Sequence, residues 1–596
     1  MIQFSKPDVE QFFRTLNVQD FVVRNDEKQL VLSTNLNGNY NLWAMDLPNE
    51  FPYPLTFHNQ PCQALYYEKK GRFIVAGFDR DGDENTQLYA IPPYGGELVP
   101  LRVKENERHF FIHLSEDGKR LYYTGTKGNP TYLNSYLYNI ETGDETRLLE
   151  GKEVPTFIAA VSPDEQSFTF VKQFGNTSSL GYVQTGGKHY LITPQEDLQQ
   201  IVSDIVYTSE TEIYFLTNYD ADLCYLAKFN VETKQFEKIL EIEKEDLRTI
   251  KYDKKNRLLY LIGSYGVEDR LYAFDLNTKK TTEILLPTSV VEKIIVAESG
   301  NLYVLGRSAI RPNNIFHSTD QGNSWKELTH FRIPGVADEQ LVEPEVFTYP
   351  SYDGLEIEAL FFQAKPENSN DHVILWPHGG PQSLERKWFR SLFQFLVNRG
   401  YSIFAPNFRG SSNYGLSFMK MVERNWGHGP RLDNVAGLEF LIEKGYAKRD
   451  KILLMGGSYG GYMALLLHGR HAEYFKAVVD IFGVSNLFSF IETVPEFWKP
   501  FMDQWVGHPE KDKELLKEHS PITYLDGMTK PMLVIQGAND PRVVKAESDQ
   551  IVEALRKKGR RVDYIVLEDE GHGFSKKENE IKVYRKILHF FDEMIN

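Results

Sequence analysis

The first half of the chain has the pattern of short β-strands. From about residue 20 to residue 335, β-branched and aromatic runs alternate with Asn, Asp and Gly turns, as in antiparallel sheets. One phrase recurs: an aliphatic residue, two variable positions, a hydrophobic residue and often a polar turn. It begins at Leu42, Leu88, Leu137, Leu180, Leu226, Leu271 and Ile315, at intervals of 46, 49, 43, 46, 45 and 44 residues. This spacing is typical of four-stranded propeller blades and predicts seven of them, with unrelated hairpins as the alternative.

The second half, from about residue 340, follows a different pattern. Short continuous apolar runs are typical of parallel strands buried on both faces, and amphipathic helical stretches separate them. The predicted strands are 373–376, 402–407, 451–455, 477–482, 532–536 and 562–567, and the predicted helices are 388–398, 433–444, 461–471, 545–558 and 577–595. An antiparallel hairpin is expected at 356–360. This alternation predicts a doubly wound, mostly parallel α/β domain.

The two patterns divide the chain into three segments. Residues 1–20 are expected to form a helical extension that packs on the second domain, because Phe12, Phe13, Leu16 and Val18 can form a short amphipathic helix. Residues 21–335 are predicted to form the seven-bladed β-propeller. Residues 336–596 are predicted to form the α/β domain.

Composition and charge narrow the class of protein. The net charge of −16 would repel phosphate backbones, so nucleic acid is not expected as a partner. Two cysteines, Cys62 and Cys224, do not make a disulfide framework and fit a reducing compartment. The first residues lack the pattern of a signal peptide, and no stretch of about 18 apolar residues suits a membrane span. We therefore expect a cytoplasmic protein, and homo-oligomer formation stays open.

The most specific local motif surrounds Ser458. A predicted strand leads into Gly-Gly-Ser458-Tyr-Gly, and an apolar helix follows. This is the context of a G-x-S-x-G nucleophile elbow: Gly456 and Gly460 leave room for a sharp turn that projects the serine hydroxyl above the sheet. A glycine-rich turn without chemistry and a phosphate cradle are the alternatives. A Walker loop would need Gly-Lys-Ser/Thr, which is absent here.

A serine nucleophile needs a base and an acid, and α/β-hydrolases supply them in the order Ser, acid, His. Asp540 follows the predicted strand 532–536, and His572 follows the strand 562–567. Because parallel strands end at one edge of the sheet, these side chains can meet Ser458. The competing carboxylates and histidines are Asp569, Glu570, His468, His471 and His589.

The same motifs predict the roles of further groups. His572 would take the Ser458 proton, and Asp540 would orient the imidazole. The backbone N–H of Tyr459 would be one oxyanion donor. The second would come from the HGG-type loop 376–381, from Gly380.

Five phrases together resemble the prolyl oligopeptidase family of serine peptidases. They are His378-Gly-Gly-Pro381, Asn407-Phe-Arg-Gly-Ser-Ser-Asn-Tyr-Gly415, Gly456-Gly-Ser-Tyr-Gly-Gly461, Asn539-Asp-Pro-Arg-Val543 and Gly571-His-Gly573. The resemblance implies a propeller joined to an α/β-hydrolase domain, with the propeller limiting access to short or unfolded peptides. It implies no cofactor and no metal.

Within that family the chain looks similar to the acylaminoacyl peptidases. It has no tyrosine from 363 to 400, where other branches place an oxyanion tyrosine, and no Glu-Glu pair for a free amino terminus. Arg542 resembles the family's clamp on a substrate carbonyl, a surface ion pair being the alternative. Trp498, Phe501 and Leu487 lie where the family lines its S1 pocket, although core packing would also explain them.

The sequence thus predicts a serine peptidase that hydrolyses short peptides and releases N-acylated amino acids from blocked ones. A carboxylesterase or general oligopeptidase with the same triad is the alternative, and a propeller scaffold with an inactive hydrolase is a third. The segment Asp79–Asp83 resembles a calcium loop, but it lacks the glycine and glutamate that such a loop needs. A hairpin turn is predicted there instead.

Overall fold

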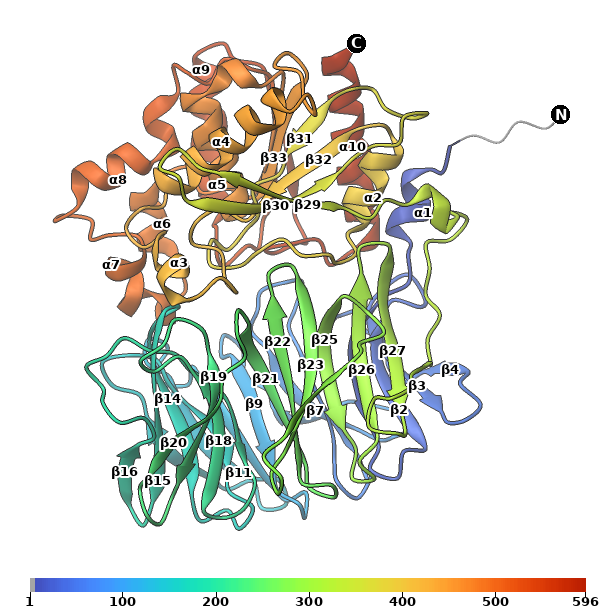
Figure 1. Cartoon of the computed structure of the whole chain (residues 1–596), viewed down its shortest axis with the longest axis vertical. Coiled ribbons are helices and arrows are strands. Elements are labelled where there is room, and N and C mark those ends of the chain that lie inside the picture. The colour runs from blue at the N-terminus through green and yellow to red at the C-terminus, as the bar shows by residue number, and fades with distance from the viewer. Residues whose placement is uncertain (1–5) are drawn as a thin grey trace.

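The computed structural model describes residues 6–596, so the first five residues of the predicted N-terminal extension lie outside the described part. Two domains are stacked, with the all-β domain below the α/β domain in Figure 1. Within the described residues there are seven four-stranded sheets and one eight-stranded sheet. The predicted fold class, a seven-bladed propeller plus an α/β-hydrolase domain, is confirmed.

Each blade is an antiparallel meander of four consecutive strands. Blades 1 to 4 consist of β1 (Val18–Val23), β2 (Gln29–Thr34), β3 (Asn41–Asp46) and β4 (Pro52–Pro54); β5 (Cys62–Tyr67), β6 (Ile74–Phe78), β7 (Gln87–Ile91) and β8 (Val99–Arg102); β9 (His109–Leu114), β10 (Arg120–Gly125), β11 (Asn134–Asn139) and β12 (Glu145–Glu150); and β13 (Thr156–Val161), β14 (Phe168–Gly175), β15 (Ser178–Thr185) and β16 (Lys188–Leu191). Blades 5 to 7 consist of β17 (Val202–Tyr207), β18 (Glu212–Thr217), β19 (Tyr225–Asn230) and β20 (Phe236–Leu240); β21 (Asp246–Asp253), β22 (Leu258–Tyr265), β23 (Glu268–Asp275) and β24 (Thr281–Ile284); and β25 (Val290–Val296), β26 (Leu302–Ser308), β27 (Arg311–Ser318) and β28 (Lys326–Glu327).

The recurring sequence phrase falls on the third strand of every blade, from β3 to β27. Its aliphatic first residue is buried in six of the blades, as Leu42 and Ile315 illustrate, and Leu137 of β11 is partly exposed. Such residues pack between neighbouring blades, which is how a small sheet buries both of its faces. The ring closes between the first and the last blade, where Lys293 Nζ lies 2.7 Å from Asp20 Oδ1 and apolar residues of both blades share one core.

The α/β domain is built on one twisted sheet of order β29-β30-β32-β31-β33-β34-β35-β36. The first two strands are antiparallel to their neighbours, and the rest are parallel. The strands are β29 (Glu345–Pro350), β30 (Glu356–Phe362), β31 (Val373–Leu375), β32 (Ser402–Pro406), β33 (Ile452–Gly457), β34 (Val478–Ile481), β35 (Met532–Gly537) and β36 (Val562–Leu567).

Helices cover both faces of this sheet (Figure 1). In β33 the side chains alternate between two cores, with Ile452 and Leu454 on one face and Leu453 and Met455 on the other. Because both faces are buried, this strand consists of an uninterrupted run of apolar residues. The helices are α2 (Ser391–Asn398), α3 (Leu416–Lys420), α4 (Gly429–Glu443), α5 (Tyr459–Arg470), α6 (Leu487–Thr493), α7 (Met502–Trp505), α8 (Lys513–His519), α9 (Lys545–Lys557) and α10 (Lys577–Ile595), with short 3-10 turns at η1 (Asp338–Gln340), η2 (Ala472–Tyr474), η3 (Glu496–Phe501) and η4 (Pro521–Tyr524).

A short helix before the propeller, α1 (Val9–Phe13), lies against the α/β domain. The Phe13 ring stacks on Tyr584 of α10 at 4.5 Å, and the Phe12 ring lies 5.6 Å from Phe395 of α2. Figure 1 shows α1 beside these helices, above the propeller. The chain therefore contacts the α/β domain both before it enters the propeller and after it leaves.

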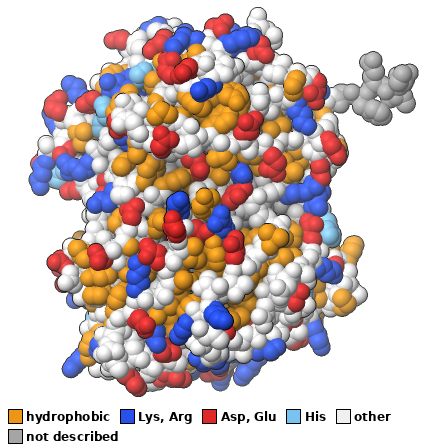
Figure 2. Space-filling view, viewed as in Figure 1, with side chains coloured by type: hydrophobic (Ala, Val, Ile, Leu, Met, Phe, Trp, Pro, Cys, Tyr) orange, Lys and Arg blue, Asp and Glu red, His pale blue; other side chains and the backbone are white. Residues whose placement is uncertain are grey.

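The two domains also meet through polar contacts along the propeller's upper rim. Asp222, in the β18–β19 turn, accepts hydrogen bonds from the backbone N–H of Ser417 (2.7 Å) and from its hydroxyl (3.0 Å). It thus caps the start of α3. On the face drawn in Figure 2, acidic and basic side chains are interspersed over both domains. No helix among residues 6–596 combines the length and the apolar character needed to cross a membrane.

Candidate active site

Ser458 occupies the turn between β33 and α5. Its backbone has φ 58° and ψ −123°, a strained conformation that a residue other than glycine rarely adopts. The backbone N–H of Ser458 donates to the carbonyl of Ile481, at the end of the neighbouring strand β34 (2.9 Å). The turn is therefore fixed to the sheet, and the strain is what directs the hydroxyl away from it.

Steric crowding requires glycine on either side of Ser458. A β-carbon at Gly456 would collide with the backbone of Gly460, and one at Gly460 would collide with the carbonyl of Pro377. One at Gly461 would lie 2.5 Å from the Asp480 carboxylate. Close packing of strand, helix and the 377–379 loop thus requires the glycines that the sequence motif contains.

Ser458, His572 and Asp540 form a continuous hydrogen-bonded chain. The Ser458 hydroxyl lies 2.9 Å from His572 Nε2, and His572 Nδ1 lies 2.6 Å from Asp540 Oδ2. Because a carboxylate only accepts, the ring proton belongs on Nδ1, and Nε2 is free to accept from the serine. The other Asp540 oxygen accepts the backbone N–H groups of Arg542 and Val543, each at 2.9 Å. These bonds hold the carboxylate in place.

The competing residues are engaged elsewhere. Glu570 is fully buried and accepts from the backbone N–H of Ser575 (2.8 Å) and of Lys576 (2.9 Å), so it organises the turn after His572 rather than lying on the surface. Asp569 pairs with the Lys576 ammonium at 2.6 Å. His468 is buried on α5 and accepts the Lys530 N–H.

The loop after β31 lies directly beside the nucleophile. A β-carbon at Gly379 would lie 3.4 Å from Ser458 Cβ. Gly380 follows with φ +129°, a conformation that favours glycine. Tyr459 is the first residue of α5, and first-turn N–H groups have no acceptor within their own helix. Both predicted oxyanion donors therefore belong to segments that border Ser458.

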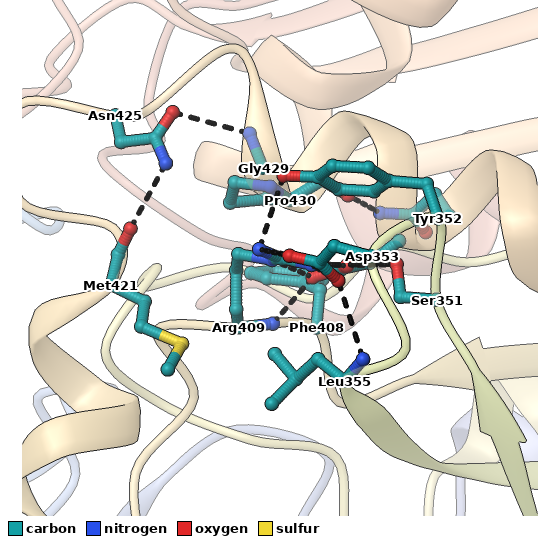
Figure 3. Close-up of polar contacts among 12 residues, drawn as sticks. Ser351, Tyr352, Asp353, Leu355, Phe408, Arg409, Met421, Asn425, Gly429 and Pro430 are labelled. Carbon is teal, nitrogen blue, oxygen red and sulfur yellow. Dashed lines mark hydrogen bonds and ion pairs between the residues drawn. The ribbon is translucent and has the colours of Figure 1, made fainter.

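The 407–415 segment supports that loop, and Arg409 anchors it (Figure 3). The Arg409 guanidinium pairs with Asp433 (2.7 Å) and Asp353 (2.8 Å) and lies over the Tyr352 ring. Its backbone N–H also donates to Asp433 (2.8 Å). Asp433 is completely buried, so this paired and fully bonded charge fixes where Phe408 and Ser411 lie.

A cavity of about 430 Å³ opens next to His572, between the domains. Arg542 reaches into it and pairs with Glu84 of the β6–β7 loop, with Arg542 Nε 2.6 Å from Glu84 Oε1. The second oxygen of Glu84 accepts from Arg108 (3.1 Å), whose guanidinium lies over the rings of Phe110 and Phe497. The propeller thus contributes a carboxylate and a cation to the wall of this cavity.

The same propeller loop touches the loop of the base. A β-carbon at Gly82 would lie 2.9 Å from the backbone nitrogen of Gly571, the residue before His572. Asp81 pairs with Lys576 at 3.2 Å. Asp79, which also lines the cavity, is buried, and burial together with the nearby Asp83 raises the pKa of its carboxyl group. The segment Asp79–Asp83, whose sequence resembles a calcium loop, lies in the turn between β6 and β7.

The predicted S1 residues lie in an aromatic cluster beside Tyr459. Trp498 and Phe501 both contact Trp505, whose ring lies 4.9 Å from that of Trp426, and Trp426 lies 5.1 Å from Tyr459. Trp498 is partly exposed, whereas Leu487 has no exposed surface and packs within the core.

Sequence reasoning did not identify the propeller residues of this site. Glu84 and Arg108 line the cavity, yet they lie more than 300 residues before Ser458 and carry no local motif. The run of acidic residues from Asp79 to Glu84 was the available signal. Among residues 6–596, no group of three or more His, Cys, Asp or Glu side chains is arranged to hold a metal ion.

Comparison with known proteins places this geometry in context. Residues 387–596 match the model of the prolyl oligopeptidase family. The chain is 25% identical over 621 residues to a dipeptidyl peptidase family member 6 of Caenorhabditis elegans, covering 96% of this chain and 84% of that protein. It is 40% identical over 212 residues to dipeptidyl aminopeptidase BIII of Pseudoxanthomonas mexicana, covering 35% of this chain and 31% of that protein.

The fold is shared by solved structures. A puromycin-hydrolyzing peptidase of Mycobacterium tuberculosis superposes with a TM-score of 0.86 at 18% identity, covering 100% of this chain and 97% of that one. At this identity the likeness concerns the fold.

Proposed function

Because the α/β domain of this chain belongs to the prolyl oligopeptidase family, we propose that the protein is a serine peptidase that hydrolyses short peptides with Ser458, His572 and Asp540. The observation that carries the proposal is the unbroken hydrogen-bonded chain from the Ser458 hydroxyl through His572 to Asp540. A scaffold without chemistry would not need a strained serine and a buried carboxylate aligned on one imidazole.

The reaction follows from this geometry. His572 Nε2 accepts the proton as Ser458 Oγ attacks the scissile carbonyl, and the imidazolium then gives that proton to the leaving amine. In deacylation His572 takes a proton from a water molecule whose oxygen attacks the acyl carbonyl. The bond between Ser458 Oγ and the acyl carbon then breaks, and His572 returns the proton to Ser458. Asp540 keeps the imidazole oriented and stabilises its charged form. The N–H groups of Tyr459 and Gly380 would bind the oxyanion, each donor contributing on the order of 10²–10³ in rate.

The substrate would occupy the cavity between His572 and the propeller. Its volume of about 430 Å³ suits a few residues of an extended peptide, and Arg542 would bind a substrate carbonyl there. The aromatic cluster of Trp498 and Phe501 would border the S1 pocket and favour apolar residues at the cleavage position. The propeller, as a lid over this cavity, would restrict access to short or unfolded chains.

For the finer specificity we propose peptides with blocked, N-acylated amino ends. Both oxygens of Glu84 are bound to arginines, so this carboxylate is not free to pair with a substrate ammonium group. Burial favours the neutral form of Asp79, which weakens it as a second acceptor. A neutral acyl group fits such a wall better than a charged amine does.

A dipeptidyl peptidase is the second candidate, favoured by the names of the two relatives above. Matched peptides that differ only in N-terminal acetylation separate the candidates. The acyl-peptidase proposal expects a higher kcat/KM for the acetylated peptide. A strong preference for the free amine with release of dipeptides would contradict it.

The test of the catalytic proposal is Ser458→Ala. We expect kcat for a blocked peptide to fall by about 10⁶, as when a triad serine is removed, and labelling by a fluorophosphonate probe to disappear. Circular dichroism and thermal unfolding serve as controls for folding. Retained cleavage by the folded variant would contradict the proposed nucleophile. We also propose the cytoplasm as the site of action, since Cys62 and Cys224 are unpaired.

A further inference from the structure

We propose that Phe482 is a positioning residue for the base, because its ring fixes the plane of the His572 imidazole and keeps Nε2 aligned on Ser458 Oγ. Phe482 directly follows β34 and belongs to none of the motifs that identified the triad. The inference rests on the proposed peptidase function and adds a residue that the reaction needs. Phe482 acts through His572 and takes no part in proton transfer.

The loop that carries His572 gives the imidazole little restraint of its own. Gly571 and Gly573 flank His572, so the neighbouring residues have no side chains to pack against the ring. The hydrogen bond from Nδ1 to Asp540 (2.6 Å) fixes one atom of the imidazole. A single hydrogen bond still lets the ring tilt about that atom, so the imidazole plane needs a further contact.

The Phe482 ring supplies this contact. Its centroid lies 4.7 Å from that of the His572 ring, and the two planes are at 48°, within the range of favourable aromatic pairs. The same ring reaches the nucleophile turn, since a β-carbon at Gly457 would lie 3.5 Å from Phe482 Cε2. The ring therefore contacts the base on one side and borders the chain just before Ser458 on another.

The backbone of Phe482 is strained at this point. Its φ is +43°, a left-handed conformation that is rare for a bulky residue. Such strain persists only where surrounding contacts enforce it, and it is concentrated at functional sites. An extended conformation would continue β34 along the sheet, whereas the observed one turns the chain out of the sheet beside His572.

The peptide group before Phe482 joins the strands of the nucleophile and of the acid. The Ile481 carbonyl accepts the Ser458 N–H (2.9 Å), and the Phe482 N–H donates to the Ile535 carbonyl (2.8 Å). Ile535 belongs to β35, whose exit loop carries Asp540. Phe482 is thus fixed through its backbone to the segments that hold Ser458 and Asp540, and its ring lies against the third member of the triad.

The residue after Phe482 is held equally firmly. The Gly483 N–H donates to Oδ1 of Asp480 (3.0 Å), whose side chain is completely buried. A β-carbon at Gly483 would collide with that carboxyl group and with Gly461 of α5. Because the end of β34 packs so closely against α5, the turn has no room to relax, and Phe482 keeps its strained conformation.

Two variants separate the ring from the volume that it fills. Phe482→Leu keeps an apolar side chain on the same strained backbone but presents no flat face to the imidazole. Phe482→Tyr keeps the ring and adds one oxygen to a side chain that is only partly buried. We expect Phe482→Leu to lower kcat for a blocked peptide by about tenfold with KM within about twofold, because a misaligned base slows proton transfer and leaves ground-state binding intact. The Tyr variant should stay within about threefold of wild type.

A small activated ester shows whether the loss lies in the base or in the peptide site. Its hydrolysis also begins with transfer of the Ser458 proton to His572, so Phe482→Leu should lower its kcat by a similar factor. A double-mutant cycle with His572→Ala completes the test. Once the base is absent, adding Phe482→Leu should change the residual ester hydrolysis by less than about twofold.

Any other result overturns the inference. Wild-type kcat in a folded Phe482→Leu would show that the ring is not needed. Equal losses in the Leu and Tyr variants, a Leu variant that is unfolded by circular dichroism, or a further tenfold loss on the His572→Ala background would show that Phe482 serves the fold and not the base. A loss confined to KM for the peptide would make Phe482 part of the substrate pocket instead. Wild-type cleavage by Ser458→Ala would overturn the proposed function itself, and that measurement involves no Phe482 variant.

Discussion

The propeller contacts the α/β domain on two sides that differ in burial. On the side of blades 6 and 7, Asp269 of β23 is completely buried between Arg248 of its own blade and Arg386 of the α/β domain. It also accepts the backbone N–H of Val291 (2.8 Å). Burial alone would raise the pKa of Asp269, but the two guanidinium groups outweigh that effect and lower it.

On the side of blades 2 and 3 the contacts are more open and border the cavity. Glu84 and Arg542 form a pair in which the arginine side chain is 42% exposed, and the side chains of Asp81 and Lys576 are both about one-third exposed. Water screens such pairs, so each contributes little to stability. These contacts instead adjoin His572 and the proposed substrate carbonyl site.

The comparison teaches that similar ion pairs do different things according to where they lie. Removing a charge that is buried between two cations leaves unpaired buried charges, so we expect a large cost in stability. The half-exposed pair of Glu84 and Arg542 at the cavity can be lost at small cost in stability. We expect its main role to be the orientation of the Arg542 side chain. Three substitutions test this division, from the largest expected effect to the smallest.

Asp269→Ala should have the largest effect. It leaves Arg386 buried and unpaired, so we expect the free energy of unfolding to fall by about 3–5 kcal/mol, measured by chemical denaturation. Since the pKa of Asp269 is lowered in the folded protein, its stabilisation is present above the ordinary aspartate pKa. It is lost as the pH falls through the lowered value.

The control for this prediction is the adjacent, half-exposed pair of Glu268 and Lys387 (2.6 Å). Glu268→Gln should cost less than about 1 kcal/mol. Equal losses in the two variants would mean that burial does not separate the two kinds of contact.

Glu84→Gln should affect substrate binding more than stability. Without the carboxylate the Arg542 guanidinium loses its orientation, so we expect KM for a blocked peptide to rise by about threefold to tenfold with kcat nearly unchanged. Hydrolysis of a small activated ester, which does not reach Arg542, serves as the control. A fall in KM would indicate that Glu84 competes with the substrate for Arg542, contrary to the positioning role.

Asp81→Asn should have the smallest effect. Lys576 keeps its second partner, Asp569 at 2.6 Å, and the lost pair is partly exposed. We expect less than about 1 kcal/mol in unfolding free energy and kinetic constants within about twofold of wild type. A tenfold loss of kcat would show that this pair, and not backbone packing at Gly82, holds the His572 loop.

Much of the fold could be predicted from the sequence, because repeated blades and buried strands each produce a recognisable local pattern of hydrophobic residues. The third strand of each blade was recognisable, since its aliphatic residue packs between blades at a regular interval. The outer strands β4 and β28 are short and partly exposed, so little in their sequences marks them. The short helices α3 and α6 were not predicted. Each spans fewer than two turns, which is too short to show a helical period of hydrophobic residues.

For the site, strand order and exit loops were enough to choose Ser458, Asp540 and His572, and the structure brings these side chains together. Their catalytic roles remain predictions. The partners of Arg542 could not be predicted, because Glu84 is 458 residues away and its pairing depends on how the domains dock. Leu487 was predicted to line the S1 pocket because of its distance from Ser458 along the sequence, and that distance does not show whether a side chain is buried.

The position of α1 has a consequence for biosynthesis. Val9, Phe12 and Phe13 are translated before the propeller, whereas α2 and α10, which cover them, are translated after it. Domains generally fold as they emerge, so the propeller can close its ring while this apolar segment still waits for a binding surface. Complete docking of α1 must therefore wait until α10 has been translated, and this apolar segment stays uncovered while the propeller is synthesised.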